Sequence, residues 1–461
     1  MAGIAELALS PAFLIYPPLL FLIRNAVVFV LDTLRPKIDR TFPFLTYGAW
    51  AKEYGKDTPL GFKKGAAKVF VLNSGRLVRE LFERHGAVYN DRPWQFMNNT
   101  WVFRDDLRAA ISQNSSPWLA RWRREFTNNF GTAAIARLRP VYEAETARLL
   151  VKLFESPTAK GEDLEAILVC WMMSVPCLGV CGRRPDHMDD HGFTIKQFRH
   201  CSDEERARAV KEGVMKTGTH FLHAAKDKRA VLDAGRSVAW ESVLAKMLRE
   251  QREKNDHMFT VKNIGNTAFH IVSATTNALL AVLEMSGGAT PKAIDIPNLK
   301  YTDAFWNEIH RWRPVAPQGV AHAPSQDDFY DGHHIPKGTA VIMNVWNIHY
   351  SEEDYKELEK FILERFLHHP FRMRLDQAHD PAHMEASSAR ITYDFEARGY
   401  GKEIDLTLET RFIQEIALHP KDFDVVLKMR EGCTKEDIMD HYSQTCEAEA
   451  VMMGWEDALY K

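Results

Sequence analysis

Apolar side chains recur every three or four positions along several stretches of this chain, which is the spacing of helices with one buried face. The clearest stretches are Leu119–Phe130, Arg137–Phe154 and Leu164–Val180. A shorter helix is predicted through Val214–Ala225. A longer one begins near Val261 and ends near 286–288, where two glycines can supply a left-handed C-cap. The pattern predicts a mainly helical protein.

Strand patterns are fewer. Val69–Leu72 is rich in residues that favour strands, and an amphipathic helix is predicted to follow at Val78–Arg84. From Gly332 to Asn347, a short strand, a turn at Pro336-Lys337-Gly338 and an alternating strand predict a β-hairpin. The expected fold class is mainly α with a small β region. Because no repeat, low-complexity tract or Gly/Ser linker is visible, residues 37–461 are expected to form one domain.

The N-terminal residues 1–36 are predicted to be a hydrophobic membrane anchor. The apolar stretch Pro11–Leu31 is long enough to cross a bilayer, although Pro17, Pro18 and Arg24 interrupt it. Arg35-Pro36-Lys37 follows, which favours a cytoplasmic position for the rest of the chain. An interfacial helix or a core helix stays open as an alternative, because Arg24 is costly inside a bilayer.

Charge and cysteine usage narrow the possible functions. The 461 residues carry a net charge of −3, so the chain has no electrostatic reason to bind nucleic acid. Six cysteines without regular spacing indicate neither a disulfide scaffold nor a zinc site. His333 and His334 are adjacent on a predicted strand and therefore point to opposite faces, which argues against a shared metal ion. No metal ligands are predicted.

The strongest motifs lie between residues 308 and 366. Glu308 and Arg311 are three apart on a predicted helix, where their side chains can pair. Arg313-Pro314, the run IPKGTAVIMNVWNIHYS and the run FILERF with Arg365 follow in order. This ordered set resembles the cytochrome P450 family of haem-thiolate monooxygenases. The resemblance implies a P450-like fold and a buried, structural ion network of Glu308, Arg311 and Arg365.

The same resemblance implies candidate haem-site residues. The run IVSATT is similar to the family's oxygen-side motif, so that Thr275 aligns with a threonine that handles dioxygen. A packing role for this threonine is an equal alternative. Trp122, Arg123 and His322 align with residues that hold the haem propionates, although surface or packing roles stay open for each. The family's glycine and acid are Val272 and Ala274 here.

The family's iron-binding cysteine has no counterpart. Counting from Phe395 along the expected motif leads to Lys402, a poor substitute for a thiolate. A better alignment places a missing segment, containing the ligand loop and the following helix, between Phe395 and Gly401. Similar losses are inferred near Ser202, in the substrate lid, and between Leu283 and Ile296, at the end of the long central helix. The P450-like fold is therefore expected to be truncated at three places.

Two functions follow from this resemblance. In the first, the gene encodes a monooxygenase that oxidises a small apolar metabolite, of secondary metabolism, and the present chain is a gene model or splice form with skipped segments. It would use haem, receive electrons from an NADPH-dependent reductase and sit on the endoplasmic reticulum through one N-terminal span, facing the cytosol. In the second, the chain is a haem-free pseudoenzyme that binds a ligand, or folds a substrate for cyclisation or isomerisation.

Overall fold

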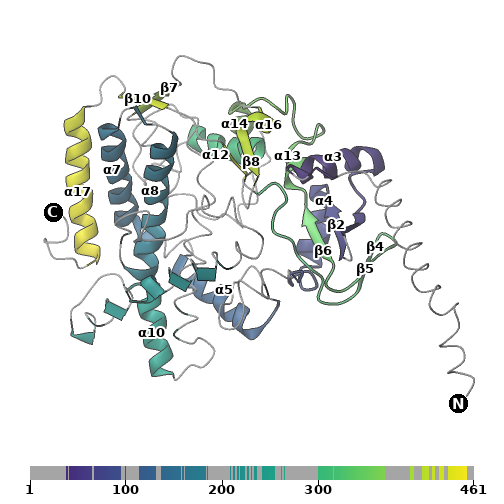
Figure 1. Ribbon diagram of the computed structural model, residues 1–461, viewed down its shortest axis with the longest axis horizontal. Coiled ribbons are helices and arrows are strands. Elements are labelled where there is room, and N and C mark those ends of the chain that lie inside the picture. Colours follow the sequence, from purple (N-terminus) through teal and green to yellow (C-terminus); the bar gives the residue numbers. More distant parts are fainter. Residues whose placement is uncertain are drawn as a thin grey trace, which may run out of the picture.

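Helices and two small groups of strands make up the described part of this chain (Figure 1). The computed structural model describes residues 38–39, 41–64, 67–94, 99, 114–130, 136–156, 158–159, 161–182, 184, separate positions between 208 and 235, 241–254, 261, 264, 300–314, 316–368, 395–398, 407–414, 418–420, 425–429 and 434–453. The prediction of a mainly helical protein with a small β region is confirmed.

The helical part contains α5 (Pro117–Phe130), α7 (Arg139–Glu155), α8 (Gly161–Cys181), α10 (Val243–Glu253) and α17 (Lys435–Met453). Helix α7 lies between α17 and α8 (Figure 1). Between α5, α8 and α10 is a core cluster that includes Trp118, Cys177, Phe221 and Leu244. The predicted helices at 119–130, 137–154 and 164–180 correspond to α5, α7 and α8. Their apolar faces meet in this core and drive its burial.

The N-terminal part joins segments that are distant in the sequence. It contains α3 (Pro43–Tyr54), β1 (Leu60–Lys64), β2 (Ala67–Leu72), α4 (Gly75–Val78) and a π-helical segment, η1 (Arg79–Arg84). From later in the chain come β4 (Asp328–Tyr330), β5 (His333–Ile335), β6 (Ala340–Met343) and α13 (Val345–His349). Ser74 caps α4 by accepting a hydrogen bond from the Leu77 amide. The strand and helix expected at 69–72 and 78–84 are thus present, the second partly as a π-helix.

The β-hairpin predicted between Gly332 and Asn347 is wrong in its pairing. Strand β5 pairs antiparallel with β4, whereas β6 pairs parallel with β2 in a sheet of order β1-β2-β6. The other edge of β6 is also used, because the Val341 amide donates to the His322 carbonyl at 2.8 Å. Since both edges of β6 are occupied, β5 has no place beside it. The turn at 336–338, with Gly338 at φ 73°, leads the chain out of one sheet and into the other.

The remaining elements connect these parts. Helices α12 (Lys300–Trp312), α14 (Glu364–His368) and α16 (Leu408–Arg411) lie near the pair of strands β8 (Phe412–Gln414) and β9 (Leu418–Pro420) (Figure 1). A second three-stranded sheet has the order β3 (Thr158–Ala159), β10 (Val425–Met429), β7 (Phe395–Arg398). Strand β10 brings the C-terminal region back to the helical part, beside α8.

Within the described residues, no helix is both long enough and apolar enough to cross a membrane. The predicted anchor, the central helix that would carry Thr275, and two of the three inferred losses lie outside these residues, as do the residues that follow Phe395-Glu396-Ala397-Arg398 at the third.

Candidate haem site

Glu308 is a fully buried carboxylate on α12. Arg311 donates to both of its oxygens, from Nε to Oε2 and from Nη2 to Oε1, each at 2.8 Å. Arg365 donates from Nε to Oε1 at 3.3 Å, and the Ile362 amide donates to the same oxygen at 3.0 Å. The sequence therefore named three residues that the structure brings together, and the fourth donor is a backbone group that no side-chain pattern could reveal.

Arg311 extends this network into the segment before α14. Its guanidinium donates to the carbonyl oxygens of Leu358 at 3.0 Å and Lys360 at 3.1 Å. Five hydrogen bonds from buried or half-buried donors thus connect α12 with residues 358–365. No bond donor of the network faces a reacting group, so its geometry is that of a structural clamp.

Arg313 forms a second buried cation that sequence reasoning left without a role. Its guanidinium carbon lies 4.2 Å from the Trp312 ring centre and 5.4 Å from those of Trp346 and Phe412. It donates to the Trp312 carbonyl at 3.0 Å and to the Tyr350 hydroxyl. A planar guanidinium among aromatic faces fixes the end of α12 where the chain turns at Pro314. The tryptophans on either side of it in the motif were the available signal.

A cluster of three cationic side chains lies at the base of β6. His322 is half-buried, with Nδ1 2.7 Å from the Tyr89 carbonyl oxygen and its ring 4.5 Å from that of Phe82. Arg92 donates from Nη1 to the carbonyls of Ala321 at 2.9 Å and Val320 at 3.3 Å. Burial lowers the pKa of His322, and the positive charges of Arg92 and Arg123 lower it further. These side chains are therefore close enough to repel one another.

This arrangement fits the carboxylate end of a haem. Burial and the charge of Arg123 lower the pKa of Arg92 as well, so that an anion placed among the three groups would relieve an existing repulsion. Arg123 and His322 were predicted from the resemblance, whereas Arg92, in the run Asp91-Arg92-Pro93, was missed. Its motif has no helical or strand period, so the pattern reasoning gave it no weight. Trp122 stacks on Phe126 at 5.4 Å beside the α5–α8–α10 core.

The iron side of a haem does not fit the described residues. Cys177 and Cys181 are buried on α8, where the Cys181 thiol donates to the Cys177 carbonyl. Burial raises the pKa values of Cys170, Cys177 and Cys446, which favours the thiol over the thiolate that iron requires. Cys201, Cys433, Thr275 and Lys402 lie outside the described residues. No chemical step through a haem iron can be built from these side chains.

Other metal chemistry finds no support in the described ranges, where no group of three or more His, Cys, Asp or Glu side chains could hold a metal ion. His333 and His334 also have separate partners. His333 lies 2.9 Å from the Asp331 carbonyl, and His334 lies 2.9 Å from the Asp327 carboxylate.

Comparisons with known proteins give a consistent picture. The family model described as Cytochrome P450 matches residues 281–379. The chain is 61% identical to the cytochrome P450 monooxygenase grgG of a Penicillium species, in an alignment that covers 100% of both proteins. It is 26% identical to cytochrome P450 monooxygenase 58 of Postia placenta, over 70% of this chain and 68% of that protein.

A solved structure supports the fold. A zebra fish cytochrome P450, determined with abiraterone, superimposes with a TM-score of 0.66 at 22% identity. The match covers 84% of this chain and 100% of the zebra fish chain. At this identity the likeness concerns the fold alone.

The alignment with the Penicillium protein is longer than this chain. It extends over 558 positions, whereas the chain has 461 residues, so at least 97 positions are filled by the relative alone. A protein with the same overall fold and 61% identity therefore contains segments that have no counterpart here.

Proposed function

Since this chain belongs to the cytochrome P450 family, we propose that its gene encodes a haem-dependent monooxygenase that oxidises a small apolar metabolite of secondary metabolism. We further propose that the present polypeptide lacks the segment that would ligate the iron. A bound haem would supply the oxidising chemistry; Arg92, Arg123 and His322 would hold its carboxylates. The cationic cluster around His322 is the observation that carries this proposal.

Two further observations support it. The Glu308 clamp preserves the geometry of α12 and the segment 358–365, although burying such a charge without complete pairing is costly. A relative at 61% identity is named a monooxygenase and fills at least 97 positions that this chain lacks. Missing segments near Ser202, between Leu283 and Ile296, and between Phe395 and Gly401 account for such a difference. None of the relatives' names supports the haem-free pseudoenzyme.

Family membership also supports the proposed partners. We expect an NADPH-dependent reductase as the electron donor and attachment to the endoplasmic reticulum through residues 1–36, with the rest of the chain in the cytosol. Thr275 is proposed to lie on the oxygen side of the haem. The ion network of Glu308, Arg311 and Arg365 is proposed to be structural.

The test compares two purified proteins, both expressed with added haem precursor. One is this chain, and the other carries the Penicillium relative's additional segments, including the one between Phe395 and Gly401. We expect the longer protein to bind one haem and to give the carbon monoxide spectrum of a thiolate ligand, and this chain to give none. The transcript of the gene should contain the additional segments.

Two results would contradict the proposal. A thiolate spectrum from the present chain would show that Cys201 or Cys433 ligates the iron, and the corresponding Cys→Ser variants would identify which. A longer protein that binds no haem would reject the monooxygenase function itself. Arg92→Ala in the longer protein should weaken haem retention, whereas Arg76→Ala, an exposed arginine on α4, should not.

A further inference from the structure

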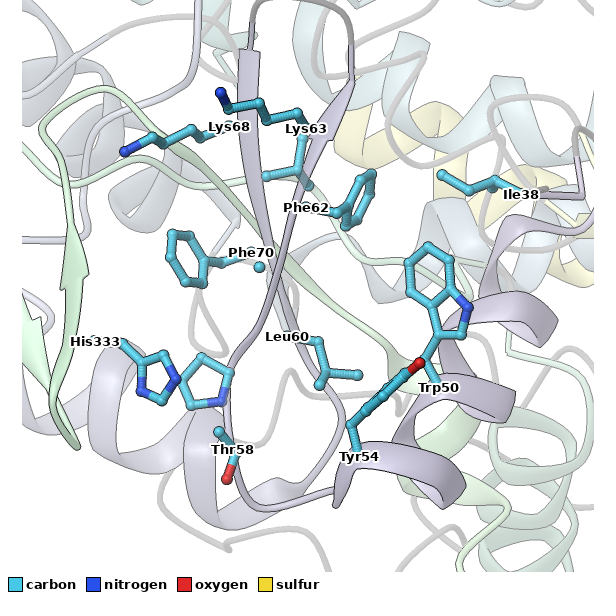
Figure 2. A pocket seen from close by; sticks show the side chains of 13 residues that line it. Ile38, Trp50, Tyr54, Thr58, Leu60, Phe62, Lys63, Lys68, Phe70 and His333 are labelled. Carbon is cyan, nitrogen blue, oxygen red and sulfur yellow. The ribbon is translucent and has the colours of Figure 1, made fainter. Parts of the chain in front are cut away.

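We propose that a groove between α3 and the β1–β2 hairpin binds the anionic headgroups of a lipid bilayer. Figure 2 shows this groove, with Trp50 and Tyr54 on one side of the hairpin and His333 on the other. Its lining is completed by Ile38, Thr58, Pro59, Leu60, Gly61, Phe62, Lys63, Lys68, Val69 and Phe70. The inference concerns the surface of the protein and stands independently of the haem chemistry.

The α3 side of the groove has amphipathic aromatic side chains. Tyr54 is 59% exposed, which is unusual for a large ring with no covering element. Trp50 lies edge-on to Phe62 at 5.4 Å, and both rings rest on the buried Tyr47, at 5.8 and 5.7 Å. Trp and Tyr rings prefer the boundary between water and lipid, because they combine an apolar body with a polar tip.

The hairpin side of the groove is positively charged. Lys63 and Lys68 are directly opposite each other across the β1–β2 register, and both are exposed. Like charges in this position repel and destabilise a hairpin. Among the described residues neither lysine forms an ion pair, whereas Lys52 and Lys56 of the same region pair with Glu352 and Glu353. An anionic surface would supply the counter-charge that the lysine pair lacks.

The chain itself would bring this groove to a membrane. Ile38 lines the groove, and only six residues separate it from the end of the apolar stretch Pro11–Leu31. A fully extended connection of this length spans at most about 25 Å. With the apolar stretch in a bilayer, the Ile38 end of the groove stays within that distance of the headgroups. Arg35 and Lys37 add two positive charges to the connection.

The test is amide hydrogen exchange of the full chain on vesicles of phosphatidylcholine, with and without phosphatidylserine. The predicted anchor holds every variant on both kinds of vesicle, so protection of residues 60–72 reports the groove alone. We expect strong protection only with phosphatidylserine, while α10 serves as an internal reference. Changing both lysines to glutamine should weaken this protection by roughly fivefold for each lysine.

Matched variants complete the design. Tyr54→Ser should also weaken the protection, whereas Lys254→Glu, an exposed lysine at the end of α10, should not. A variant with both lysines changed to glutamine loses no buried contact and removes a repulsion, so its folding is not at risk. Equal protection on both vesicle types, no protection, or equal protection by soluble glycerophosphoserine would each overturn the proposal. The last result would indicate a site for a free anion.

Discussion

At the scale of single residues, Glu308 shows how a buried charge is stabilised. Its two oxygens accept four hydrogen bonds, two from Arg311, one from Arg365 and one from the Ile362 amide. Removing one partner from such a network leaves the others buried and uncompensated. The same carboxylate on the surface would contribute little.

We therefore expect Glu308→Ala to lower the free energy of unfolding by about 3–5 kcal/mol. Chemical denaturation measured by tryptophan fluorescence tests this value. The matched control is Glu353→Ala, which removes an exposed carboxylate paired with Lys56 and should cost about 0.5 kcal/mol or less. Equal effects of the two variants would show that the Glu308 clamp does not stabilise the fold.

His349 makes a pH prediction at the same scale. Burial lowers the pKa of His349 from 6.5 to about 4, and its Nδ1 lies 2.9 Å from the His310 carbonyl. Between pH 6.5 and 4 the unfolded chain binds a proton that the folded chain does not, so stability falls as the pH falls through this window. The loss approaches about 3 kcal/mol at pH 4.

His349→Asn keeps a donor for the His310 carbonyl and removes the titrating group. We expect its stability to depend less steeply on pH between 6.5 and 4 than that of the unchanged chain. Measurements at pH 7.5 separate any packing damage from this effect. If both proteins show the same slope, His349 does not account for the acid sensitivity.

At the scale of elements, α17 is attached to α7 and α8 by a buried group of four charges. Glu449 of α17 is fully buried and accepts hydrogen bonds from Arg148 at 2.7 Å and Arg184 at 3.1 Å. Both arginines also donate to Glu145, at 2.7 and 2.8 Å. The two carboxylates and two guanidinium groups balance, so α17 completes a neutral cluster.

Glu449→Ala should release α17 from α7, because both arginines would lose a partner in a buried site. Limited proteolysis should then cleave within residues 434–453 at least about tenfold faster than in the unchanged chain. Glu447→Ala, an exposed position on the same helix, should cleave at the original rate. No change in Glu449→Ala would mean that apolar packing alone holds the helix.

The sequence predicted elements better than it predicted their partners. The 3.6-residue period located α5, α7 and α8 because each has an apolar face that its neighbours bury. Strands β5 and β6 also lie where the alternation placed them, but their pairing depends on β2 and His322, which are distant in the sequence. In α17, Ile438 is buried as its spacing indicated, whereas Val451 is 81% exposed. Local periodicity does not specify which partner a face will meet.

At the scale of the whole molecule, the candidate site was only half predictable. Glu308, Arg311 and Arg365 were found because they belong to one ordered motif, and the structure brings their side chains together. Arg92 was missed because only the folded chain brings it beside His322. The roles of Thr275 and Trp122 stay predictions, as does the single domain from residue 37 to 461.

The missing segments should also affect stability. Removing a helix from a folded protein exposes the apolar surface that it covered. We expect the chain that carries the Penicillium relative's additional segments to melt at a higher temperature than the present chain, in one cooperative transition, even without haem. A Gly/Ser insert of equal length at the same places is the control and should give no increase. Equal melting temperatures would indicate that this chain has replaced the lost contacts.

The parallel pairing of β2 with β6 also constrains how the protein is made. Val69–Leu72 must wait for Ala340–Met343 before the central strand of its sheet has both neighbours. During synthesis, most of the polypeptide leaves the ribosome while this apolar strand keeps an open edge, and such edges invite aggregation. Productive expression should therefore depend on chaperones that shield the first hundred residues until the later strand arrives.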